Sequence, residues 1–193
     1  KEVRIIQLGD RVIPGSFDKE ITDIMEAELR GHEGVSLNLN EAVSEFEGKD
    51  GKISGVKTNK GSYPADIVIL ATGVRPNTKF LEGTGIETLK NGAIVIDGRG
   101  RSSIKGIYAA GDCATVYHKI KKENVYIPLA TTSNKIGRVV GENLAGKDRE
   151  FKGTLGSAAI KVLNLEAGRT GISSDEAEKM GINYKSVFVE DKN

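Results

Sequence analysis

The chain has 193 residues, and its 28 Lys and Arg against 27 Asp and Glu give a formal net charge of +1. So close a balance argues against nucleic acid or an anionic membrane as a partner, and no apolar run reaches the length of a membrane span. Hydrophobic residues make up 38% and charged residues 28%, which predicts a globular fold. The single cysteine, Cys113, excludes an intrachain disulfide and favours a cytoplasmic location.

The first seventy residues predict several strands around one helix. The expected strands are short apolar or alternating runs, at 3–6, 35–39, 42–47, 52–58 and 67–70. Apolar residues at helical spacing predict a helix over 17–31. Asp50-Gly51 between two of the runs indicates a hairpin. The continuous run 67–70 is typical of a parallel strand covered on both faces.

The rest of the chain predicts two further groups of elements. The first comprises a short helix over 78–86, strands at 93–96 and 106–109, and a helix near 131–145. The second comprises strands at 158–163 and 167–171, a helix capped from Ser173, and a strand over 184–190. Because this last β-β-α-β order is not that of a nucleotide-binding unit, we expect a domain boundary near 147–152.

Three segments carry the chemistry. In the first, the expected strand 67–70 leads into Thr72-Gly73, where small residues let the backbone approach a ligand at the carboxyl end of a strand. In the second, the strand 106–109 leads to Gly111-Asp112, whose carboxylate can accept hydrogen bonds from sugar hydroxyls. An ordinary turn explains either segment alone.

The third segment, 127–138, places small and polar residues before a helix. The free amides at the start of that helix suit an electron-rich ring or an oxyanion. An ordinary capped helix explains the same residues.

Together the three segments resemble the pyridine-nucleotide disulfide oxidoreductase family. The shared order is Ala-Thr-Gly-x-x-Pro, then Ala-Ala-Gly-Asp after a strand, then Ile-Pro-Leu-Ala before a glycine-containing helix. Within that family the chain is most similar to the branch of coenzyme A disulfide reductases and NADH oxidases. The run 151–157 is similar to the entry of that branch into its dimerisation domain.

The resemblance implies an α/β fold made of partial Rossmann-like FAD- and NAD(P)-binding domains, with a parallel sheet plus a β-meander. The start of an α+β dimerisation domain would follow. Residues 1–70 would be the later part of the NAD(P)-binding domain and 71–147 the returning segment of the FAD-binding domain. Residues 150–193 would begin the dimerisation domain of a homodimer.

The resemblance also implies roles for single residues. Gly111 and Asp112 would lie against FAD, with Asp112 bonded to its ribityl chain, and Thr72 and Gly73 would lie near the nicotinamide nucleotide. The remaining expected cofactor contacts are backbone groups near the isoalloxazine ring, from Leu129, Ala130 and Thr131.

Gln7 departs from the family pattern, because a Glu that binds the ribose 2′-hydroxyl of NADH often stands there. The choice between NADH and NADPH therefore stays open. Asn134 and Arg138, one helical turn apart, are weaker candidates to face substrate.

No catalytic residue is expected within the chain. It holds no Gly-x-Gly-x-x-Gly, so we expect both dinucleotide fingerprints, and the redox cysteine, upstream of residue 1. Cys113 is interpreted as a packing residue. His32 and His118 have no ligand-spaced partners, so we expect surface residues and no metal site.

The implied parent enzyme passes hydride from NAD(P)H through FAD to a small-molecule disulfide, such as coenzyme A disulfide, or to oxygen. An alternative is a ferredoxin-, rubredoxin- or nitrite-reductase-type FAD reductase with a protein electron partner. A second alternative is a folded or dimerisation fragment without catalysis.

Overall fold

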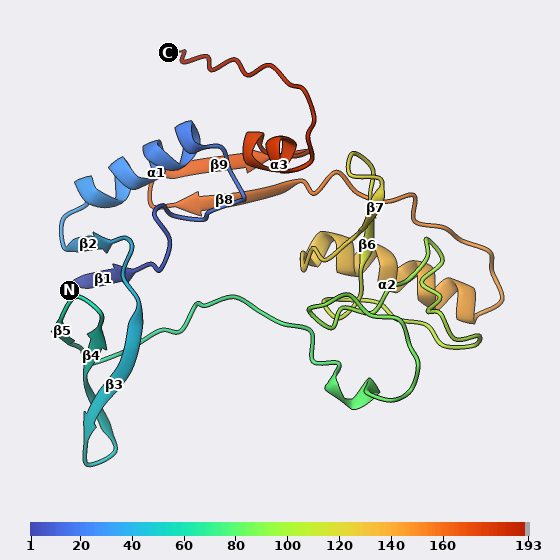
Figure 1. Ribbon diagram of the computed structural model, residues 1–193, viewed down its shortest axis with the longest axis horizontal. Helices are drawn as coiled ribbons and strands as arrows, with labels where there is room; N and C mark the ends of the chain where they lie inside the picture. The colour runs from blue at the N-terminus through green and yellow to red at the C-terminus, as the bar shows by residue number, and fades with distance from the viewer. Residues whose placement is uncertain (192–193) are drawn as a thin grey trace. The chain divides into compact units, whose positions relative to one another are not determined.

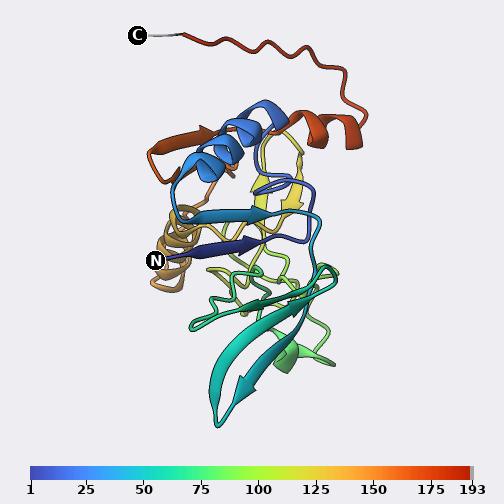
Figure 2. The same ribbon diagram turned by 90° about the vertical axis from the view of Figure 1, so that its left-hand side faces the viewer.

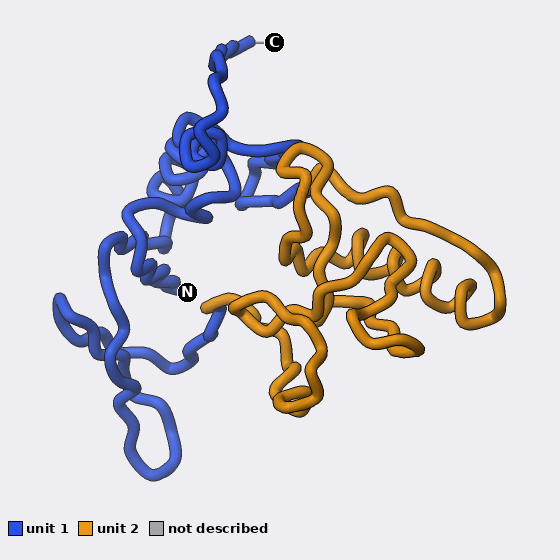
Figure 3. Tube along the Cα trace, turned by 45° about the vertical axis from the view of Figure 1, so that its right-hand side comes forward, with its two compact units in different colours: residues 1–71, 159–193 blue, residues 72–158 orange. Residues whose placement is uncertain are grey.

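The computed structural model describes residues 1–191, and the chain divides into two compact units. Unit 1 joins residues 1–71 to the C-terminal segment from 159, and unit 2 comprises residues 72–158 (Figure 3). The first expected boundary, between 70 and 71, lies next to the boundary between the units.

Unit 1 is built on a parallel strand pair connected through a helix. β1 (Val3–Ile6) pairs with β2 (Val35–Asn38) in parallel, and α1 (Lys19–Gly31) makes the crossover between them (Figures 1 and 2). The apolar stripe of α1 faces the pair and buries Met25, which is 1% exposed. The core of this unit consists of Val12, Phe17, Met25 and Leu37.

A β-meander follows the parallel pair, as the resemblance implied. Its antiparallel strands are β3 (Val43–Lys49), β4 (Lys52–Thr58) and β5 (Ser62–Pro64), in that order. At the β3–β4 turn, Asp50 and Gly51 adopt φ values of 53° and 76°, which are the left-handed conformations that such a hairpin turn requires. The hairpin prediction is confirmed.

The C-terminal part of unit 1 contains β8 (Ala158–Val162), β9 (Leu165–Arg169) and α3 (Ser174–Lys179). Figure 1 shows the two strands beside α1, and Val162 and Ala167 pack against the core of the unit. At the start of α3, the Ser173 hydroxyl accepts from the Glu176 amide and the Glu176 carboxylate accepts from the Ser173 amide. This capping box confirms the predicted helix start.

Unit 2 contains one long helix, α2 (Ala130–Leu144), and a short antiparallel pair, β6 (Val116–His118) and β7 (Glu123–Val125). Its core consists of Ile94, Ile96, Ala114 and Ile136. The expectation that His118 is a surface residue was wrong. His118 is 1% exposed, and its Nδ1 accepts from the amides of Ile120 and Lys121 in the β6–β7 turn.

Four predicted strands do not form in the described residues: 67–70, 93–96, 106–109 and 184–190. Isolated bridges, Ile94 to Ala114 and Arg101 to Tyr108, replace the middle two. A strand needs a neighbour for its N–H and C=O groups, and in the part of the chain that the structure describes, 67–70 has none. An apolar sequence alone therefore does not produce a strand.

The predicted helix over 78–86 was also wrong in extent. Only a 3-10 turn, η1 (Lys79–Leu81), forms there. Gly83 and Gly85 take φ values of 80° and 79°, and left-handed residues end a right-handed helix.

Candidate functional site

The turn after Ala110 joins the second and third motifs within unit 2. Gly111 has a φ of 89°, and a Cβ built on it meets no atom within 4 Å. The next side chain, Asp112, is exposed, and its Oδ1 accepts a hydrogen bond from the Ser133 hydroxyl at 2.5 Å. Ser133 lies in the first turn of α2. The structure thus brings an exposed carboxylate, open space beside a glycine, and a helix start to one place.

The start of α2 is suited to an electron-rich group. Leu129 is the N-cap residue, and its carbonyl accepts from the amides of Thr132 at 3.0 Å and Ser133 at 2.9 Å. Its apolar side chain has no acceptor for the amides of Ala130 and Thr131, which point out of the helix start. The positive end of the helix dipole lies here, so the Asp112 carboxylate and a polar ring are both favourable neighbours.

Two further side chains adjoin the Asp112 turn. Burial, and then the nearby Asp112 and Cys113, raise the pKa of Tyr126 above its usual 10. Cys113 packs against the core of unit 2, and its thiol donates to the Ala110 carbonyl at 3.3 Å. This is the packing role expected of Cys113.

The other expected contacts in unit 2 are exposed. Thr72 and Gly73 lie in a stretch without regular structure, and in the described chain no hydrogen bond joins them to the Asp112 turn. Gly73 takes a φ of 90° with open space around its Cα. Asn134 donates to the Ala130 carbonyl of its own helix at 2.9 Å, and Arg138 is exposed one turn further along.

Gln7 belongs to unit 1 and stands just after β1, at the carboxyl end of the parallel pair. Its amide donates to the Asn38 carbonyl at 2.9 Å, and its carbonyl accepts from the Glu41 amide at 3.0 Å. Its side-chain Nε2 donates to the Arg11 carbonyl at 3.3 Å. Gln7 therefore sits at the base of the loop that follows β1, the edge at which open α/β sheets bind nucleotides.

The sequence reasoning missed Ser133 and Glu41. Ser133 lies in the small, polar stretch at the start of α2, and no pattern distinguishes it from its neighbours. Glu41 is only 2% exposed and accepts from Thr58 and Asn38. A charged residue after a strand gives no sign of burial, because such residues are usually exposed.

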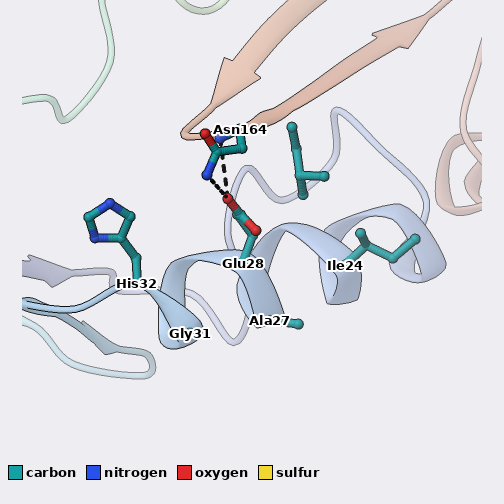
Figure 4. Close-up of a pocket in the computed structure, with 7 residues that line it drawn as sticks. Ile24, Ala27, Glu28, Gly31, His32 and Asn164 are labelled. Atoms are coloured by element: carbon teal, nitrogen blue, oxygen red, sulfur yellow. Dashed lines mark hydrogen bonds between the residues drawn. The ribbon is translucent and has the colours of Figure 1, made fainter.

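A hollow in unit 1 contains none of the motif residues. It has a volume of about 460 Å³ and lies between α1 and the β8–β9 turn (Figure 4). Its lining residues are Ile24, Ala27, Glu28, Gly31, His32, Asn164 and Leu165. Glu28 Oε1 accepts from the Asn164 amide at 3.2 Å and from its side chain at 3.0 Å. This carboxylate therefore joins α1 to the β8–β9 turn.

Across residues 1–191, no group of three or more His, Cys, Asp or Glu is arranged to hold a metal ion. No helix in the described part of the chain combines the length and the apolar character needed to cross a bilayer.

The chain is similar to a known protein family and to several proteins of known structure. A family model described as "Pyridine nucleotide-disulphide oxidoreductase" matches residues 1–137. The NAD(P)H sulfur oxidoreductase (CoA-dependent) of Pyrococcus abyssi is 42% identical over 98% of this chain and 42% of its own length. The water-forming NADH oxidase of Lactobacillus brevis, solved bound to NADH, is 38% identical with a TM-score of 0.90. It covers 98% of this chain, which spans 42% of that structure.

An engineered form of the Lactobacillus brevis enzyme is also similar. It is a water-forming NADPH oxidase with five substitutions, solved bound to NADPH. Its identity of 38%, its TM-score of 0.90 and its coverage of 98% and 42% equal those of its parent.

Proposed function

Because the chain belongs to the pyridine nucleotide-disulphide oxidoreductase family, we propose that it is part of a longer flavoprotein that passes hydride from NAD(P)H through FAD to a sulfur compound or oxygen. Relatives named as a CoA-dependent sulfur oxidoreductase and an NADH oxidase support this choice of acceptors. Among disulfides we favour coenzyme A disulfide, because one of these relatives is named as CoA-dependent. The chain spans only 42% of these relatives.

The Asp112 turn is the observation that carries the proposal. The residues fit a flavin, because the open space at Gly111 leaves room for a ligand against the backbone and the exposed Asp112 can accept from ribityl hydroxyls. Ser133 orients that carboxylate through its hydroxyl. The first amides of α2, at Ala130 and Thr131, would lie by the isoalloxazine ring. FAD, when bound, supplies the hydride chemistry, and these residues bind and orient it.

The loop after β1 is our candidate for the nicotinamide nucleotide. In the engineered NADPH oxidase, an aspartate is replaced by alanine and, seven positions later, a proline by arginine. Gln7 and Pro14 stand at that same separation here. An uncharged Gln7 neither attracts a 2′-hydroxyl as a carboxylate does nor repels a 2′-phosphate. We propose that this loop sets the preference between NADH and NADPH.

The domain assignment extends the same proposal. Residues 1–70 would belong to the NAD(P)-binding domain, 71–147 to the FAD-binding domain, and 150–193 to the dimerisation domain of a cytoplasmic homodimer. The boundary between units 1 and 2 after Ala71 supports the first division. Of this third part, the segment from 159 groups with unit 1, where Val162 and Ala167 pack against the core.

Replacement of Asp112 by alanine in the full-length protein tests the flavin site. Loss of one hydrogen bond to a charged group costs about 1.5–3 kcal/mol, so we expect flavin to bind about tenfold more weakly or worse. The measurement is flavin absorbance per protein after purification, followed by titration with added FAD. Glu123→Gln removes an equal charge from an exposed position of unit 2 and is the control. An Asp112→Ala protein with full flavin content would remove Asp112 from the site.

A further inference from the structure

The loop over 8–16, between β1 and α1, is held in part by a distant segment of the chain. Ile13 and Gly15 take left-handed φ values of 45° and 77°, which a bulky residue such as Ile13 adopts only when its surroundings impose it. Within the loop, the Ser16 amide donates to the Ile13 carbonyl at 3.3 Å. Two nearby segments also hold the loop: the Val12 amide donates to Glu26 Oε1 at 3.1 Å, and the Asn40 amide donates to the Gly9 carbonyl at 2.9 Å. The remaining contacts come from the C-terminal segment.

Arg169, at the end of β9, supplies the first of these contacts. Its Nη1 donates to the Ser16 carbonyl at 2.6 Å and to the Gly15 carbonyl at 3.4 Å. Its Nη2 donates to the Gly171 carbonyl at 3.3 Å and lies 3.7 Å from the Glu176 carboxylate. The planar guanidinium therefore joins the loop to the start of α3, as a fork with several fixed donors can.

The first turn of α3 supplies two more contacts. Asp175 forms an ion pair with Arg11, whose side chain is only 15% exposed. The Ser174 amide donates to Asp18 Oδ1 at 2.6 Å, and Asp18 is the N-cap residue of α1. Partial burial reduces the screening of the ion pair by solvent. The middle of the loop, at Arg11, and its C-terminal end, at Gly15 and Ser16, are thus joined to the segment 169–175.

These contacts are not themselves a phosphate site. A hollow of about 470 Å³ lies between the loop and α3, lined by Asp10, Arg11, Pro14, Gly15, Asp175 and Lys179. Its two carboxylates offset its two cations, so it carries no net charge to attract an anion. Arg11 is already bonded to Asp175. What the contacts do provide is a fixed shape for the loop.

We propose that Arg169 and Asp175 are positioning residues that hold the loop 8–16 in the shape that binds the nicotinamide nucleotide. The inference rests on the proposed function, since that function places the nucleotide against this loop. Its consequence is that a segment more than 150 positions away in the sequence controls nucleotide affinity. Neither residue touches hydride donor or acceptor, so affinity should change while the chemical step does not.

Steady-state kinetics of the full-length flavoprotein test the proposal through Arg169→Gln and Asp175→Asn. We expect KM and Kd for NADH to rise about tenfold, which corresponds to about 1.4 kcal/mol, with kcat and flavin content unchanged. Kd is measured by titration of NADH fluorescence. Arg169→Lys keeps one donor for the Ser16 carbonyl but loses the fork, so its KM should lie between those of the wild type and Arg169→Gln.

Glu28→Gln is the matched control, because it weakens a contact of the same C-terminal segment, with Asn164, at the far end of α1. Its KM for NADH should stay at the wild-type value. Unchanged KM in Arg169→Gln and Asp175→Asn would overturn the positioning role while leaving the proposed function intact. Loss of flavin and kcat with KM unchanged would assign both residues to general stability, which also overturns it. A wild-type protein that binds neither NADH nor NADPH would instead refute the proposed function.

Discussion

Gly100 is a position of unit 2 where no side chain fits without a shift of its neighbours. It has a φ of 78°, and a Cβ there would overlap with Cγ2 of Val140 on α2. Because overpacking costs about 1–3 kcal/mol and a left-handed φ adds strain, we predict that Gly100→Ala lowers the free energy of unfolding by about that amount or more. Thermal unfolding of the full-length protein, followed by circular dichroism, measures the change as a lower Tm.

Gly141 provides the comparison for Gly100. It lies inside α2, and a Cβ there meets no atom within 4 Å. Alanine favours a helix over glycine by about 0.8–1.0 kcal/mol, so Gly141→Ala should raise Tm slightly. Equal effects of the two substitutions would show that the contact between Gly100 and Val140 does not limit packing.

Among the elements, Glu41 joins the parallel pair of unit 1 to its meander. Its carboxylate accepts from Thr58 Oγ1 at 2.6 Å and from Asn38 Nδ2 at 2.7 Å, which links β4 to β2. The hydrogen bonds from Thr58 and Asn38 lower the pKa of Glu41 from its usual 4.5, although burial opposes them. A lowered pKa in the folded state means that the ionised carboxylate stabilises the fold above pH 4.5, and that this stabilisation is lost as pH falls through the folded-state value.

Glu41→Gln should therefore reduce Tm at neutral pH and respond less to acid. We predict that the difference in Tm between wild type and variant is largest near pH 7 and narrows below about pH 4.5. Tm measured in steps across this range checks the prediction. Glu45→Gln removes an exposed carboxylate that lies 3.7 Å from Lys57, and such pairs contribute little. A difference for Glu41→Gln that widens in acid would contradict the assigned direction of its pKa.

Elements with strictly local signals were predictable from the sequence. The β3–β4 hairpin follows from Asp50-Gly51, and the start of α3 from Ser173 and Glu176, because each signal lies within four residues of the structure it determines. The runs 93–96 and 106–109 have strand-like sequences but form only single bridges. Their pairing depends on what lies beside them in space, which no local pattern contains.

For the candidate site too, the local motif was predictable from the sequence and its distant partners were not. Gly111-Asp112 is a backbone motif, so its place on an exposed turn could be expected from its sequence. Its partner Ser133 lies 21 positions further along, and only the packing of α2 brings the two together. Likewise, Arg11 and Asp175 are separated by 164 positions, and nothing in either segment indicates the other.

At the scale of the whole molecule, the apolar run 67–70 is largely exposed. Ile67, Ile69 and Leu70 are 80%, 85% and 68% exposed, in a sequence typical of a strand covered on both faces. The relatives are more than twice as long as this chain, which leaves room in a full-length protein for the strands that would flank this one.

We predict that amides 67–70 exchange hydrogen rapidly in the isolated 193-residue chain and slowly in the full-length protein. An amide without a β-ladder partner is open to solvent, and a central strand exchanges only when its surroundings open. Hydrogen exchange followed by mass spectrometry makes the comparison, with peptides from β4 (Lys52–Thr58) as the internal reference. Residues 55–57 of β4 already lie between two partner strands, so their amides should be protected in both proteins. Rapid exchange at 67–70 in the full-length protein would mean that these residues remain without a partner strand, and that their apolar sequence has another explanation.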